Sequence, residues 1–498
     1  MQSSRSLWLF ALCALGSGSV ACGKPAVPPK KASFDGPATP RVSGIDQRKK
    51  LGVTIYNADF AVIREQREVD LVKNGRTALQ LEGVAAHIQP ETVHLKSLAG
   101  PDALEVYEQN FRYDLLTPAK MLEKYVGKQI KVYRWNSLLG VEEPVAAKVL
   151  AAENGQQPVF EIGGEVTYGY PGRLAFPEVP ANLVAKPTLV VMVGSPLGKQ
   201  TIELGYSTYQ MAWKSDYVVT VDADDTKADI TGWVTLDNRS GAAFPDAELK
   251  LVAGDVQKFA PPNYPMDEED LDGAEDGPMM KEAPAKPAFK EEGLFEYHLY
   301  TLGRPTTLLQ NEKKQVTLLE AASVPVKKLL LFSGTAGYYR GKYGAIASNQ
   351  KVSVFLEFEN KKEHHLGIPL PKGIVRVYKA DKSGAQQFIG EDHIDHTPRD
   401  EKVRVKMGEA FDVVGDRKQM SWKPHGYCTS ESDWEISLRN HKDKAETVRI
   451  VEPAEGDWQI LSSSHPAKKE DAHTFFFDVP VPAKGETKVT YRVSVKWC

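Results

Sequence analysis

Apolar and polar residues alternate along most of the chain with a period of two, which is the pattern of β-strands with one buried face. The clearest case is residues 489–497, where Val, Tyr, Val, Val and Trp alternate with Thr, Arg, Ser and Lys. Similar runs occupy residues 51–55, 352–358 and 475–479. Strands joined by short turns, with no helices alternating between them, predict a mainly β fold of antiparallel β-sandwiches with few helices.

One segment departs from this pattern and predicts a helix. Thr117 is a suitable N-cap, Pro118 suits the first helical turn, and Gly127 can end the helix. The apolar residues between them fall on one helical face. We expect this helix to connect an N-terminal β-region, residues 51–126, to the region that follows.

The rest of the chain divides by composition. Short apolar runs and glycine-containing turns predict a small inserted β-barrel-like region at residues 127–180. A central β-sandwich is predicted at residues 181–345 and a C-terminal β-sandwich at residues 346–498. Residues 261–292 are rich in Asp, Glu and Pro, which predicts a disordered acidic loop within the central sandwich. The spacing of its carboxylates does not fit a calcium-binding loop.

The N-terminus has the layout of an export signal. Arg5 precedes the unbroken apolar run Leu7–Leu15, and small residues then lead to Cys22, so residues 1–21 are predicted to be a signal peptide. The segment before Cys22 resembles a bacterial lipoprotein box, although Ser19 stands where that pattern prefers Leu. We expect lipid attachment at Cys22 and a proline-rich disordered tether at residues 22–50. Ordinary signal-peptidase cleavage, with Cys22 incidental, is the alternative.

This N-terminus predicts a location in the cell envelope. Gly23 rather than Asp follows the cysteine, which in similar lipoproteins favours the outer membrane, here its periplasmic face. The balance of 62 Lys and Arg against 66 Asp and Glu provides no basic field for nucleic acid. The expected partners are therefore the membrane, through the lipid anchor, and an envelope protein or polysaccharide.

Two cysteines of the exported chain remain besides Cys22. Cys428 and Cys498 face an oxidising compartment, where a pair of cysteines tends to form a disulfide. We expect this disulfide, with two separate thiols as the alternative.

The sequence contains no motif of a common catalytic class, such as G-x-S-x-G, H-E-x-x-H or a phosphate-binding loop. The best polar constellation is residues 391–398, where His393 and Asp395 share one strand face while His396 lies on the other. Two ligands on one face can begin a metal site, but no third ligand can be named. A polar strand end before a turn is the simpler interpretation, so we predict no catalytic residue, no metal and no cofactor.

An aromatic loop at residues 337–343 is a second candidate, because its three tyrosines and two cations can stack on a sugar or hold an anionic polymer. A hairpin with aromatic edges is the simpler interpretation.

Short segments spread along the chain carry a resemblance to known proteins; they are residues 108–110, 113–116, 213–217, 232–238, 251–256, 295–300, 304–307, 318–321, 371–373, 376–378, 394–398 and 438–442. Together they resemble the bacterial family called domain of unknown function 4139, from about residue 50 to the C-terminus. This resemblance implies β-sandwich architecture with an immunoglobulin-like C-terminal domain, and it implies no established catalytic residue. The family is similar in part to mucoidy inhibitor A proteins, whose usual coiled-coil stretch is not seen in this sequence.

Two classes of function follow. The first is a non-catalytic envelope lipoprotein that binds or supports another envelope protein or a surface polymer. The alternative is a hydrolase of envelope polymers, metal-assisted through His393 and Asp395. Stoichiometric zinc in the purified protein would favour the hydrolase.

Overall fold

The computed structural model describes residues 37–112, 114–153, 156–180, 183–258 and 288–498. The predicted signal peptide, the predicted lipid-attachment residue Cys22 and most of the acidic segment lie outside these ranges. The described chain is mainly β, as its alternating pattern predicted, and α1 (Pro118–Lys124) is its single α-helix. It also contains short 3-10 helices, namely η1 (Ile45–Gln47), η2 (Pro101–Ala103), η3 (Ala336–Tyr339) and η4 (Lys362–His364).

In these described ranges, no helix combines the length and the apolar character that crossing a membrane requires.

The N-terminal half builds a sandwich of two sheets around one apolar core, which we call the proximal unit. Leu81 and Val191 of one sheet belong to the same core as Ile63 and Leu204 of the other. The smaller sheet has the order β1 (Thr39–Ser43), β4 (Gly75–Glu82), β12 (Thr188–Ser195) and β6 (Glu105–Arg112). The larger sheet has the order β17 (Phe289–Leu294), β18 (Tyr297–Leu302), β16 (Phe244–Ala253), β2 (Arg48–Tyr56), β3 (Phe60–Asp70), β13 (Lys199–Tyr209) and β5 (Ile88–Ser97), with β19 (Thr306–Leu308) paired to β16.

Two segments predicted to be disordered are partly folded into this unit. Residues 39–50 belong to β1, η1 and the start of β2, where β1 pairs in parallel with β4 and Arg48 forms an ion pair with the buried Glu65. Residues 289–292 belong to β17, which pairs with β18 and buries Phe289. The tether and loop predictions are therefore wrong at these ends, because pairing with distant strands orders residues whose local composition is polar.

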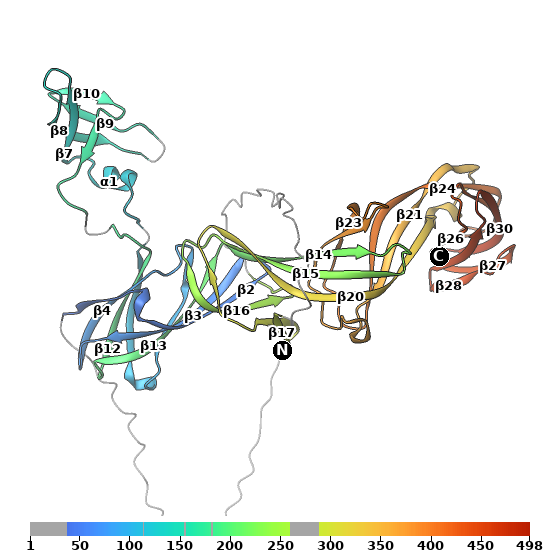
Figure 1. The fold of residues 1–498 in the computed structure, drawn as a ribbon, viewed down its shortest axis with the longest axis horizontal. Coiled ribbons are helices and arrows are strands. Elements are labelled where there is room, and N and C mark those ends of the chain that lie inside the picture. The colour runs from blue at the N-terminus through green and yellow to red at the C-terminus, as the bar shows by residue number, and fades with distance from the viewer. Residues whose placement is uncertain (1–36, 113, 154–155, 181–182, 259–287) are drawn as a thin grey trace, which may run out of the picture.

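The inserted unit, residues 114–180 and 183–184, grows from the smaller proximal sheet between β6 and β12 and stands apart from the rest of the molecule (Figure 1). Its open antiparallel sheet has the order β10 (Glu165–Tyr168), β9 (Val159–Ile162), β8 (Val141–Ala151), β7 (Gln129–Asn136) and β11 (Arg173–Ala175). Thr117 caps α1 by accepting a hydrogen bond from Lys120 N at 3.2 Å.

The barrel-like closure predicted for this region is not found, since β10 and β11 remain the two edges of the described sheet. Instead of closing into a barrel, the sheet buries one face against α1 and the residue that follows it. Met121, Leu122 and Tyr125 form one core with Val132 and Phe160 of the sheet.

A fourth sheet extends from the proximal unit to the distal end of the molecule, and Figure 1 shows β14, β15 and β20 running parallel to the long axis in its middle part. Its order is β23 (Gln386–Ile394), β22 (Gly373–Ala380), β14 (Met211–Val221), β15 (Lys227–Asn238), β20 (Glu312–Ser333), β21 (Ala345–Glu359), β24 (Lys402–Pro424), β25 (Thr429–Asn440), β30 (Gly485–Lys496) and β27 (Asp457–Ser463). Three further strands pair beside this path, namely β26 (Glu446–Pro453), β29 (Thr474–Val481) and β28 (Lys468–Asp471).

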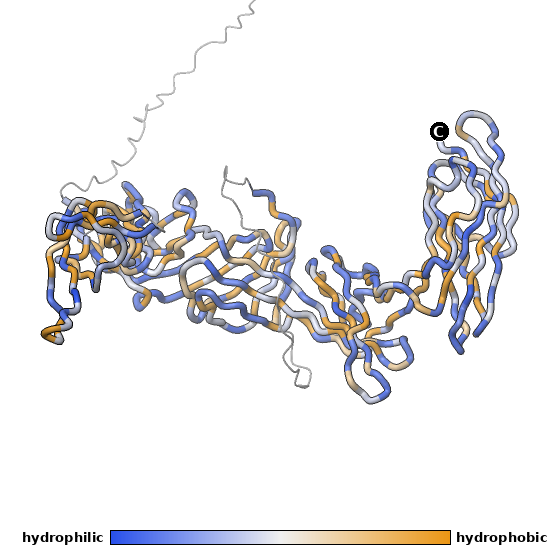
Figure 2. The backbone as a smooth tube through the Cα atoms, turned by 90° about the horizontal axis from the view of Figure 1, so that it is seen from above, coloured by the Kyte–Doolittle hydropathy of each residue, from blue (hydrophilic) through white to orange (hydrophobic). Residues whose placement is uncertain are grey.

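Two more cores lie along this sheet. The core of the middle unit includes Tyr217, Val377 and Val405, and the core of the distal unit includes Trp434 and Phe477. Figure 2 shows the distal unit, which carries the C-terminus, turned across the long axis of the molecule.

The predicted boundary between residues 345 and 346 does not coincide with a division between these cores, because the middle core takes residues from both sides of it. Strands β20, β21 and β24 each contribute to more than one core. The immunoglobulin-like character of the C-terminal part stays a prediction.

Candidate functional site

The polar constellation predicted around residue 394 lies where β23 ends. His393 is exposed at the end of the strand, opposite Ile374 of β22. Asp395 is also exposed, and its backbone oxygen accepts a hydrogen bond from Thr397 Oγ1 at 2.8 Å. His396 is half-buried and reaches the proximal unit. The three side chains therefore do not form a single site.

Both ring nitrogens of His396 are engaged. Its Nδ1 accepts a hydrogen bond from the backbone N–H of Lys372 at 3.2 Å, and its Nε2 lies 3.3 Å from the side-chain amide of Asn57. Asn57 follows β2 of the proximal unit, whereas Lys372 and His396 belong to the middle unit. This histidine therefore links two units rather than offering a free nitrogen to a substrate or a metal.

Charged side chains from both units surround His396. Lys372 Nζ lies 3.1 Å from Asp255 Oδ1, and His298 Nδ1 lies 2.8 Å from Glu291, which also pairs with Arg399. Burial lowers the pKa of His396, and Lys372 lowers it further, against a smaller opposing effect of Asp255 and Asp395. In the neutral imidazole Nδ1 can accept a hydrogen bond, so an environment that lowers the pKa favours the hydrogen bond from the Lys372 N–H.

Several of the segments that carry the family resemblance meet at this junction. Residues 251–256, 295–300, 371–373 and 394–398 supply its Asp, His and Lys side chains. Within the described part of the chain, no group of three His, Cys, Asp or Glu side chains is placed to hold a metal. The arrangement can fix two units against each other, and the sequence pattern alone did not indicate this role.

The aromatic loop at residues 337–343 is not an open binding platform. Tyr339 is buried and donates a hydrogen bond to Glu452 at 2.9 Å, and Tyr338 packs on the distal core. Tyr343 is exposed, and Arg340 is paired with Glu455. Two of the three tyrosines thus pack in or against the distal core, which leaves too little exposed ring surface for stacking on a sugar.

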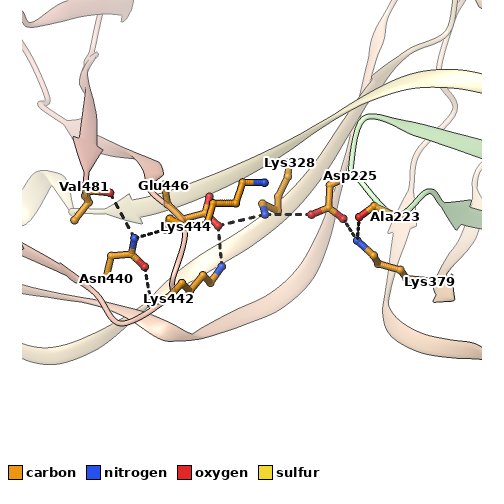
Figure 3. Close-up of polar contacts among 9 residues, drawn as sticks. All are labelled: Ala223, Asp225, Lys328, Lys379, Asn440, Lys442, Lys444, Glu446 and Val481. Atoms are coloured by element: carbon orange, nitrogen blue, oxygen red, sulfur yellow. Dashed lines mark hydrogen bonds and ion pairs between the residues drawn. The ribbon is translucent and has the colours of Figure 1, made fainter. Parts of the chain in front are cut away.

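A charged network spans the junction between the middle and distal units (Figure 3). Lys328 of β20 lies 3.2 Å from Asp225 in the β14–β15 turn and 3.4 Å from Glu446 of β26. Asp225 also contacts Lys379 of β22, and Glu446 lies 3.0 Å from Lys442. Lys328 therefore connects carboxylates of two different units.

The inserted unit exposes several large apolar side chains. The turn between β7 and β8 carries Leu138, 94% exposed, and Leu139, 65% exposed, and Trp135 near the end of β7 is 67% exposed. At α1 the same unit has an apolar groove of about 470 Å³. The groove is lined by Leu116, Thr117, Pro118, Met121, Leu122, Tyr170, Gly172, Leu174 and Phe176.

This hairpin was not among the sites predicted from the sequence, because it carries no cluster of ionisable or aromatic side chains of the kind that predicted the other two. The available signal was two consecutive leucines just before Gly140, in a place where the alternation of flanking residues predicts a tight turn. Turns usually carry polar residues, so a leucine pair at this place departs from the usual composition of a turn.

The structure joins Cys428 and Cys498 in a disulfide, with their Cα atoms 5.7 Å apart. Cys428 precedes β25 and Cys498 follows β30, and these two strands pair along their whole length. The bond lies at the end of the distal unit, away from the junction of the proximal and middle units.

Comparison with known proteins identifies one family. Residues 202–498 match the family model described as Domain of unknown function (DUF4139). The matched range includes the middle and distal units and leaves the inserted unit outside. No curated protein matches the chain significantly.

Proposed function

Because the chain belongs to the family Domain of unknown function (DUF4139), whose description names no activity, we propose from the structure that it is a non-catalytic lipoprotein of the cell envelope. In this role it binds or supports another envelope component. The family prediction made from sequence segments is confirmed over residues 202–498.

The observation that carries this proposal is the continuity of long strands between cores. The 22-residue strand β20 contributes Val316 to the proximal core, Val324 to the middle core and Phe332 to the distal core. At about 3.3 Å per residue it spans roughly 70 Å. Strands shared between cores resist bending at the junctions, and this supports a role as an extended scaffold.

The polar side chains of the junctions support the same role. His396 and Lys328 each contact two units, and both are occupied with partners of the chain itself. Side chains committed to internal contacts are poor candidates for acid–base chemistry, which needs a group within reach of a substrate proton. The exposed apolar surface of the inserted unit is better suited to binding.

Attachment to the membrane is proposed to occur through Cys22, on the periplasmic face of the outer membrane. A single acyl chain binds membranes only marginally, whereas several chains hold a protein durably. The test is fractionation of cells that produce the wild type, Cys22→Ser and the matched control Cys13→Ser. We expect the wild type and Cys13→Ser in the membrane fraction with incorporated fatty acid, and Cys22→Ser without fatty acid in a soluble fraction. Identical fractionation of Cys22→Ser and wild type would overturn the anchor.

A further inference from the structure

An ammonium group lies between two aromatic rings at one end of the larger proximal sheet. The Nζ atom of Lys258 is 4.0 Å from the centre of the Phe60 ring and 4.2 Å from the centre of the Tyr209 ring. The same nitrogen donates a hydrogen bond to Oε1 of Gln89 at 2.9 Å. The faces of aromatic rings attract cations, and an amide oxygen accepts from an N–H. Phe60, Tyr209 and Gln89 therefore form a site for a primary ammonium group, which we call the ammonium site.

Three neighbouring strands supply the ammonium site. Phe60 begins β3 and Tyr209 ends β13, and the two residues lie opposite each other in the antiparallel register. Gln89 belongs to β5 and lies opposite Ser207 of β13. Lys258 comes instead from the segment that follows β16, and it belongs to no strand. The sheet thus provides the site, and a separate segment of the chain provides its occupant.

Contacts that do not involve Lys258 hold the side chains of the ammonium site in place. The ring of Tyr56 stacks on that of Phe60, with centroids 4.3 Å apart and an interplanar angle of 11°. Gln89 is 8% exposed and donates from Nε2 to the Tyr209 hydroxyl at 2.8 Å, so its Oε1 is left to accept from the ammonium. Side chains that are ordered in advance lose little entropy when a ligand binds. The site therefore does not need its own lysine to keep its geometry.

The side chain of Lys258 attaches its segment to the sheet. Within the described part of the chain, neither Gln257 nor Lys258 has a backbone hydrogen bond, and the N–H of Val256 bonds to Gly254 of the same segment. Lys258 is half-buried rather than enclosed. It can therefore leave the site without breaking a backbone hydrogen bond of the described residues.

The electrostatic surroundings of the site favour a cation. Burial lowers the pKa of Lys258, and the carboxylates of Glu91 and Asp59 oppose this effect. Glu91 belongs to β5 and Asp59 to the turn between β2 and β3, so both stay beside the site when the occupant changes. The two carboxylates act in the same way on an ammonium group of another molecule.

We propose that the ammonium site binds primary ammonium groups and that Lys258 is its internal occupant, which a free alkylamine or a lysine side chain of another protein replaces. This inference goes beyond the proposed scaffold role and does not depend on the anchor at Cys22. An occupant on a short tether acts at a local concentration of about millimolar, so an external amine has to compete with it. The segment that Lys258 holds also carries Asp255, which pairs with Lys372 of the middle unit, so the exchange takes place beside the junction of the two units.

The test follows the ammonium site in the full chain, purified in detergent, with 4-fluorophenylalanine in place of Phe60 as a fluorine NMR reporter. Lys258→Ala empties the site, and the matched control Lys290→Ala removes an exposed lysine of β17 in the same unit. Each chain is titrated with n-butylammonium chloride, against sodium chloride at the same ionic strength. We expect a saturable shift in Lys258→Ala with a midpoint at least about tenfold lower than in the wild type and in Lys290→Ala, where Lys258 still competes.

Three further titrations of Lys258→Ala define the ligand. Adding Tyr209→Leu should weaken the binding of butylammonium about tenfold, because one of the two aromatic faces is lost. Tetramethylammonium should bind more weakly than butylammonium, because it has no N–H to donate to Gln89. N-acetyl-lysine methylamide separates the two sources of the amine: binding as tight as that of butylammonium admits a lysine side chain of another protein, and weaker binding assigns the site to free alkylamines.

Three results would overturn the proposal. Absence of a saturable shift in both Lys258→Ala and Lys258→Ser would show that the site accepts only its own lysine. An equal midpoint in the wild type would place the amine elsewhere on the chain. Binding of tetramethylammonium as tight as that of butylammonium would exclude recognition of the N–H groups. Because none of these titrations involves a membrane, their outcome is independent of the test of Cys22.

Discussion

At the scale of single residues, the cores enclose ion pairs that the sequence does not reveal. In the distal unit, Arg417 of β24 contacts Glu452 of β26, and both side chains are at most 1% exposed. Tyr339 donates to the same carboxylate, and the Arg417 guanidinium lies 5.0 Å from the centre of the Phe332 ring. Burial alone would lower the pKa of Arg417, but the Glu452 carboxylate outweighs it and the pKa is raised. Such pairs are costly to break rather than strong net stabilisers.

We therefore expect Glu452→Gln to lower the free energy of unfolding of the distal unit by roughly 3–5 kcal/mol, because it leaves Arg417 buried without a counter-charge. Urea unfolding followed by tryptophan fluorescence, to which the buried Trp434 contributes, measures this change. The matched control is Glu455→Gln, whose carboxylate is 57% exposed and pairs with Arg340, and which should cost less than about 1 kcal/mol. Equal stability of the two variants would contradict the prediction.

At the scale of elements, bulges decide which core a strand serves. In β20, Val316 and Leu318 belong to the proximal core, whereas Leu319 and Ala321 belong to the middle core on the opposite face. The pairing of β20 with β15 skips one residue between Thr317 and Leu319 and shifts again between Ala321 and Val324. Each one-residue shift exchanges the buried and exposed faces of a strand. A single strand can therefore supply cores that lie on different sides of it.

A disulfide between Cys428 and Cys498 joins two paired strands at the end of the chain. It closes a loop over a sequence separation of 70 and holds the end of β30 against β25. We expect titration of the denatured, non-reduced chain to find no free thiol at Cys428 and Cys498, and two after reduction. Reduction should destabilise the distal unit by up to roughly 4 kcal/mol, the chain-entropy value for such a loop. Two free thiols before reduction would disprove the bridge.

At the scale of the whole molecule, charged contacts connect the middle and distal units across the junction that β20, β21 and β24 cross. Lys328 bridges Asp225 and Glu446, and all three side chains are less than one third exposed. Burial raises the pKa of Asp225, but Lys379 and Lys328 lower it more, so the net shift is downward. The stabilisation by Asp225 is thus present above the ordinary carboxyl pKa of 3.8 and is lost as the pH falls below it.

We expect Lys328→Met to remove roughly 1 kcal/mol from this junction and to broaden the range of angles between the two units. Spin labels at Lys382→Cys in the middle unit and Glu470→Cys in the distal unit report this as a wider distance distribution. The control is Lys484→Met, which removes an exposed pair with Asp443 inside the distal unit and should leave the distribution unchanged. A distribution in Lys328→Met that matches the control would show that the shared strands alone fix the junction.

The sequence by itself predicted the mainly β class, the helix α1 and the family. Alternation in residues 489–497 predicted β30, and Thr117 with Pro118 predicted the start of α1, because period and capping depend only on neighbours in the chain. Only the tertiary structure shows which core each strand joins and that the inserted sheet stays open. It also brings His396 into contact with Asn57, 339 residues away in the chain. It also decided that Tyr339 is buried while Leu138 is exposed. Which core a side chain enters and which strand it pairs with depend on segments far away in the chain, and a local pattern does not specify them.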